Sequence, residues 1–156
     1  MKKKIFCDID NTIADQYGYF LIQKKKDSSF IINNIDLYKL KKIPYSKSSI
    51  SKLSKLYQFH WLSARDQQDY NLTKMWLKKN GFPCKNINLV KRHKDKLKFL
   101  KKIKTETYIY IDELKYDYEN KKPKVMTKLI KEIKKEKINF IRFKNNWREI
   151  TKELIF

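Results

Sequence analysis

The chain has 156 residues, the length of a single domain, and its 41% hydrophobic and 14% aromatic content predicts a folded core despite 35% charged residues. The formal net charge is +21. No run of 18 apolar residues is present and acids soon interrupt the basic start, so we expect neither a membrane span nor a secretory signal. The wide separation of Cys7 and Cys84 argues against a disulfide framework and favours a reducing, cytoplasmic location.

The net charge has two explanations. A basic excess is typical of proteins that bind nucleic acid. A low-GC genome produces the same excess, because it favours Lys, and only four of the 38 basic residues are Arg. Proteins that read nucleic acid favour Arg for bidentate contacts. The charge alone therefore makes a polyanionic partner only somewhat more plausible.

The first half of the chain begins with an apolar run over residues 4–9, which predicts a strand. Residues 13–43 follow no regular pattern, and we expect an insertion there with a helix and a small hairpin. Apolar residues at helical spacing predict a helix over 46–56. A second strand is predicted over 57–62, and an amphipathic helix over 67–80.

The second half repeats this alternation of strand and helix. Strands are predicted over 87–90, 107–111 and 138–143, and helices over about 97–103, 124–136 and 147–154. Strands that alternate with helices of this length indicate a mostly parallel sheet with helices on both faces. We therefore expect one α/β domain over residues 1–156, with a Rossmann-like, three-layer, five-stranded architecture.

Polar side chains follow three of the predicted strands. Asp8 and Asp10 end the first, Ser63 ends the second, and Asp112 and Glu113 end the fourth. In a parallel sheet the carboxyl ends of the strands share one edge, where ligands bind. Neighbouring carboxylates repel unless a cation neutralises them, and their hard oxygens suit Mg²⁺. Each acid could instead merely end a strand and cap a helix, but the agreement of three strand ends favours a site.

Three segments resemble motifs of the haloacid-dehalogenase (HAD) superfamily of phosphatases. DIDNTI at 8–13 resembles its DxDxT motif, LSAR at 62–65 resembles its second motif, and IYIDE at 109–113 resembles its fourth. The motifs occur in the family's order and span most of the chain. The resemblance implies a Mg²⁺-dependent phosphomonoesterase with a minimal cap inserted after the first strand, at about residues 14–43.

The resemblance also implies a role for each matching residue. Asp8 would be the nucleophile that forms an aspartyl-phosphate, and Asp10 would be the general acid and base. Ser63 would hydrogen-bond the transferring phosphoryl group. Asp112 would hold Mg²⁺ together with Asp8 and the backbone carbonyl of Asp10. Thr12 would stabilise the turn, and we place it with the substrate-binding residues.

Two motif positions have more than one candidate. The lysine of the third motif is Lys96 or Lys94, and we favour Lys96 because it directly precedes the apolar face of its helix. The second acid of the fourth motif is Glu113 or Asp117, where the family usually has a second Asp.

The substrate expectation depends on two arginines. Arg65 and Arg92 are similar to substrate-contacting positions in the phosphatase half of polynucleotide kinase-phosphatases, and the 5'(3')-deoxyribonucleotidase branch shares these features. We therefore expect a nucleotide, or the 3'-phosphate of a DNA or RNA end, in a cleft that the small cap leaves open. The alternatives are a sugar phosphate or another small metabolite, and a non-catalytic basic module that binds nucleic acid. No obligate protein partner and no membrane association are expected.

Overall fold

The computed structural model describes residues 1–103, 107–115 and 124–156. Its centre is a five-stranded sheet with strand order β3-β2-β1-β4-β5, and every neighbouring pair of strands is parallel. The strands are β1 (Lys4–Cys7), β2 (Gln58–Ser63), β3 (Ile87–Leu89), β4 (Tyr108–Asp112) and β5 (Phe140–Arg142). The prediction of an α/β fold with a parallel sheet is confirmed.

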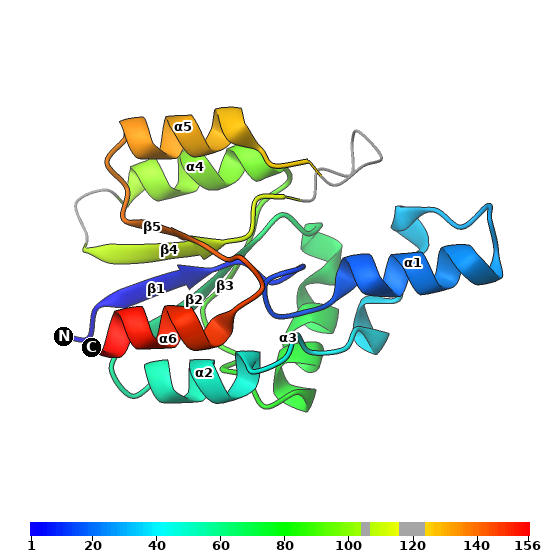
Figure 1. The fold of residues 1–156 in the computed structure, drawn as a ribbon, viewed down its shortest axis with the longest axis horizontal. Coiled ribbons are helices and arrows are strands. Elements are labelled where there is room, and N and C mark those ends of the chain that lie inside the picture. The colour runs from blue at the N-terminus through cyan, green and yellow to red at the C-terminus, as the bar shows by residue number, and fades with distance from the viewer. Residues whose placement is uncertain (104–106, 116–123) are drawn as a thin grey trace.

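Helices cover both faces of this sheet (Figure 1). The described α-helices are α1 (Gln16–Lys26), α2 (Ser46–Leu53), α3 (Tyr70–Lys79), α4 (His93–Lys102), α5 (Thr127–Lys135) and α6 (Trp147–Ile155). Three short 3-10 helices join them: η1 (Ile32–Asn34), η2 (Leu37–Lys39) and η3 (Gln67–Asp69). None of the helices in the described ranges has the length and apolar character needed to cross a membrane.

Alternation along the strands divides the core into two layers. In β1, Ile5 and Cys7 pack with residues of α2, α3 and α6, whereas Phe6 faces α4 and α5. The same alternation in β4 sends Ile109 and Ile111 to the first layer. The sheet is therefore buried on both faces, as expected for parallel strands.

The insertion differs from its prediction. Residues 14–43 form α1, η1 and η2, and the expected hairpin is wrong: the β contacts there are isolated bridges from Ala14 to Asp10 and Lys42. α1 contributes no buried residue and projects away from the sheet (Figure 1). The returning chain is instead fixed by α3, where the Trp76 indole Nε1 donates to the Leu40 carbonyl at 2.9 Å. The hydrogen bond from the Trp76 side chain thus holds this segment in place, where the prediction had a pair of hairpin strands.

The strand order places the site. The chain runs from β1 to β2 and β3 on one side, and then returns to β4 on the other side of β1. Such a reversal opens a crevice at the carboxyl ends of the two strands that flank it, β1 and β4. The register pairs Cys7 with Ile111, so Asp8 and Asp112 follow as neighbours.

Candidate active site

A buried lysine joins the two carboxylates at the crevice. Lys96, from the first turns of α4, donates through Nζ to Asp8 Oδ1 and to Asp112 Oδ2, both at 2.7 Å. All three residues are at most 3% exposed. Buried charges of this kind are tolerated because each is paired. The structure therefore brings Lys96 to the site, whereas the competing Lys94 is exposed.

The pair of carboxylates is electrostatically unequal. Burial, followed by the neighbouring Asp112 charge, raises the pKa of Asp8 to about 7. Burial also acts to raise the pKa of Asp112, but the Lys96 ammonium and further partners outweigh it, and the pKa lies below its ordinary value. One of those partners is the Tyr110 hydroxyl, which donates to Asp112 Oδ2. Asp112 is therefore the more firmly ionised of the two.

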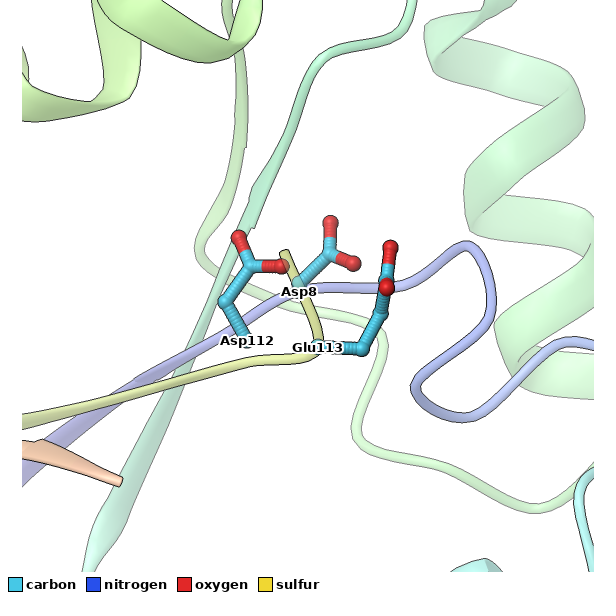
Figure 2. A group of neighbouring side chains, drawn as sticks. All are labelled: Asp8, Asp112 and Glu113. Atoms are coloured by element: carbon cyan, nitrogen blue, oxygen red, sulfur yellow. The ribbon is translucent and has the colours of Figure 1, made fainter. Parts of the chain in front are cut away.

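Glu113 completes a cluster of three carboxylates with Asp8 and Asp112. Each offers an oxygen within 4.8 Å of the others' oxygens, and all three residues are buried. Figure 2 shows the three carboxylates turned to the same side of the sheet edge. Burial, and then the Asp112 charge, raises the pKa of Glu113 to about 9. The ionised form of Glu113 is therefore disfavoured unless a cation binds beside it. Clustered hard oxygens match the donor preference of Mg²⁺. The other candidate acid, Asp117, lies outside the described residues.

Asp10 is held by an arginine rather than by this cluster. Arg65 donates through Nε to Asp10 Oδ2 at 2.8 Å and through Nη2 to Asp10 Oδ1 at 2.6 Å. Its Nη1 donates to Thr73 Oγ1 at 2.9 Å, and Arg65 is only 5% exposed. This bidentate pairing fixes the direction of the Asp10 carboxylate. Arg65 thus lines the pocket, but its guanidinium is already engaged by Asp10 and Thr73.

Ser63 has a buried hydroxyl without a partner. It is the last residue of β2, it is 1% exposed, and its Oγ makes no hydrogen bond within the described part of the chain. A buried polar atom left unpaired is costly, and native proteins retain such atoms mainly where they have a function. Ser63 and Asp8 line the same pocket.

Thr12 acts on Asp8 from behind. Its hydroxyl donates to Asp8 Oδ2 at 3.0 Å, and the residue is completely buried. The Thr12 carbonyl accepts from the Trp147 indole at 2.7 Å, which ties the turn to α6. Full burial leaves no surface for a ligand, which corrects the placing of Thr12 among the substrate-binding residues: it orients the carboxylate.

Arg92 neither lines the pocket nor contacts a described residue that does, except through its helix neighbour His93. It is exposed, and its Nε lies 3.3 Å from Asp95 Oδ2. It lines a neighbouring groove instead. Arg92 therefore lies beside the pocket that contains Asp8, and its contact with substrate stays a prediction.

The pocket has a volume of about 610 Å³, and the insertion forms part of its wall. Gln16, η1 and η2 contribute to the lining, together with residues at or just after the carboxyl ends of β1, β2 and β4. Besides Asp10 and the carboxylate cluster, three acids line it: Asp36, Asp66 and Asp69. Away from the reacting centre, the pocket is therefore acidic.

Several contributors were not anticipated from the sequence. Tyr110 appeared only as a strand residue, although its position two before Asp112 on the same strand places both on one face. No sequence pattern marks the pocket residues of the insertion, because their approach depends on the tertiary fold.

Comparison with solved structures shows the same fold in phosphatases. A class C acid phosphatase from Bacillus anthracis with tungstate bound matches with a TM-score of 0.63 and 19% identity, over 94% of this chain and 68% of that chain. A haloacid dehalogenase-like family hydrolase from Streptococcus pneumoniae matches with a TM-score of 0.57 and 13% identity, over 98% of each chain. No family model matches the sequence, and no curated protein matches it.

These likenesses define the class of fold. The chain has the Rossmann-like α/β fold of HAD-like hydrolases, over nearly its full length. At such low identities the comparison establishes the architecture. The chemistry has to be argued from the site itself.

Proposed function

We propose that the protein is a Mg²⁺-dependent phosphomonoester hydrolase that works through an aspartyl-phosphate intermediate. The observation that carries this proposal is the pairing of a buried, oriented carboxylate with an unpartnered hydroxyl in one pocket. Asp8 is held by Lys96 and Thr12, and the Ser63 hydroxyl has no partner in the described chain. Phosphoryl transfer needs a nucleophile in line with the leaving oxygen and a donor to a non-bridging phosphoryl oxygen, which are the roles of Asp8 and Ser63 in this proposal.

The reaction then has two steps. In the first, an Asp8 oxygen forms a bond to phosphorus while the bond to the leaving oxygen breaks, and Asp10, which begins this step protonated, gives that oxygen its proton. In the second, Asp10 takes a proton from water, the water oxygen bonds to phosphorus, and the Asp8–phosphorus bond breaks to release inorganic phosphate. The Ser63 hydroxyl donates to a phosphoryl oxygen, and the Lys96 ammonium balances the negative charge of the phosphoryl group and the nearby carboxylates.

The carboxylate cluster would hold the metal. Asp8, Asp112 and Glu113 supply three hard oxygens, and the backbone carbonyl of Asp10 is the further expected ligand. Bound there, Mg²⁺ would supply positive charge to the phosphoryl group. Arg65 keeps the Asp10 carboxylate directed, and Tyr110 keeps Asp112 directed.

For the substrate we propose a nucleotide or a nucleic-acid 3'-phosphate. The small size of the insertion supports it, because a short cap leaves room for a large substrate, and a tungstate-bound fold neighbour is consistent with an oxyanion site. A sugar phosphate or other small metabolite is the second candidate, because the polar, acidic pocket wall can accept sugar hydroxyls. The expected cytoplasmic location belongs to the same proposal.

The test is a hydrolysis screen with Mg²⁺ over mononucleotides, 3'-phosphorylated oligonucleotides, sugar phosphates and a small aryl phosphate. We expect release of inorganic phosphate that Asp8→Asn abolishes, while circular dichroism shows the variant folded. Lys94→Gln, at an exposed position of α4, is the control variant and should still turn over the aryl phosphate. Full turnover by Asp8→Asn would overturn the mechanism.

A further inference from the structure

A strongly basic groove adjoins the active-site pocket. It has a volume of about 690 Å³ and is lined by the starts of α4 and α5 and the segment before α5. Its cationic side chains are Arg92, Lys94, Lys124 and Lys128, and Glu132 is its only described acid. All four cations are exposed, so a ligand can reach them.

The groove and the pocket meet at His93. His93, the first residue of α4, lines both, and Lys96 of the same helix reaches Asp8. A ligand whose terminal phosphate lies at Asp8 can therefore extend past His93 into the groove. α4 and α5 share one core layer over the sheet, and both helices begin at the edge where the strands end (Figure 1).

The two halves of this cleft have opposite charge. The outer wall of the pocket carries Asp36, Asp66 and Asp69, while Arg65 in that wall is neutralised by Asp10. In the groove, Lys94, Lys124 and Lys128 have no ion-pair partner in the described ranges, and only Arg92 is paired, with Asp95. The additional phosphates of a substrate are thus repelled from the insertion side and attracted to the α4–α5 side.

We propose that the groove binds the phosphodiester backbone of a nucleic-acid strand whose terminal phosphate is hydrolysed at Asp8. This inference rests on the proposed function and narrows its substrate from nucleotides to polynucleotide ends. Several exposed lysines are better suited to bind a chain of phosphates than one phosphate group. Each ammonium acts as a point charge that imposes no fixed geometry on the phosphate it contacts. Recognition is therefore electrostatic and independent of base sequence.

The experiment compares substrate lengths. The wild-type protein and the Lys124→Gln/Lys128→Gln variant are assayed with a 3'-mononucleotide and with 3'-phosphorylated single strands of two, four and eight nucleotides, over a range of salt. We expect wild-type kcat/KM to rise with length. The variant should lose about tenfold on the longest strand and keep its activity on the mononucleotide. Its salt slope on that strand should be shallower by about 1.4, from two contacts at about 0.7 each.

The matched control is Lys52→Gln/Lys55→Gln, which removes the same charge at exposed positions in and just after α2. It should behave as the wild type on every substrate. Equal loss in both variants would mean that only net charge matters, and kcat/KM independent of length would mean that the groove is not used; either result overturns the inference.

The proposed function can fail separately. If no phosphate ester is hydrolysed, the chemistry is wrong, and the groove is tested by fluorescence anisotropy of a labelled, 3'-phosphorylated eight-nucleotide strand. Weaker binding by the groove variant than by the control variant supports the groove. Equal binding by the two variants overturns it.

Discussion

At the scale of single residues, the site depends on Lys96. One ammonium serves two carboxylates that enter from different strands, and without it both would be buried and uncompensated. Burial acts to lower the pKa of Lys96, but the two carboxylates raise it above its ordinary value, so the charge is permanent. Lys96 is therefore structural as well as electrostatic.

Replacing it should be costly. Lys96→Met should lower the free energy of unfolding by about 3–5 kcal/mol, because two buried acids lose their partner. Lys94→Met, at an exposed position two residues away, should change it by no more than about 0.5 kcal/mol. Urea unfolding followed by circular dichroism measures both. Similar losses in the two variants would contradict the pairing seen here.

Much of the site is predictable at this scale, for a physical reason. Asp8, Ser63 and Asp112 follow apolar strands, and parallel strands bring their carboxyl ends together whatever the details of packing. The state of Arg65 was not predictable: its side chain was expected to meet substrate, yet it is paired with Asp10 across 55 positions in the chain. Long-range pairing of side chains leaves no local pattern to find.

At the scale of elements, the insertion is fastened to the body by α3. Leu40 is buried, and its carbonyl accepts from Trp76, whose ring stacks on Phe82 with centroids 5.7 Å apart. This anchor supports the segment that forms one wall of the pocket. The prediction of a hairpin was wrong here because a short apolar segment can be buried by packing against a helix as well as by pairing with another strand.

Trp76→Phe should loosen this wall. The smaller ring leaves a cavity and the Leu40 carbonyl loses its buried donor, which together should cost at least about 1–3 kcal/mol of unfolding free energy. Amide exchange in residues 35–42 should speed up more than in β1. Met75→Leu, on the exposed side of the same helix, is the control and should change neither. Unchanged exchange in that segment would show that the anchor is dispensable.

At the scale of the whole molecule, the net charge and the charge at the site have opposite signs. The net charge of +21 repels cations from the protein as a whole, while the cluster of Asp8, Asp112 and Glu113 concentrates acid at one buried point. Any stabilisation by a divalent cation must therefore be local. Most of the lysines are solvated, and only the strand order decides where the acids gather.

Mg²⁺ should accordingly stabilise the wild-type protein at constant ionic strength. Binding to the folded state alone adds about 2.7 kcal/mol at a hundredfold excess over Kd, and so raises Tm. Asp112→Asn removes one ligand and should abolish most of that rise, whatever its own starting Tm, whereas Asp95→Asn, at an acid of α4 outside the cluster, should keep it. EDTA should reverse the effect. Differential scanning calorimetry measures the change in Tm. A loss confined to Asp112→Asn would place the cation at this cluster, whereas an equal rise in the wild type and Asp112→Asn would place it elsewhere, because binding would then not need Asp112.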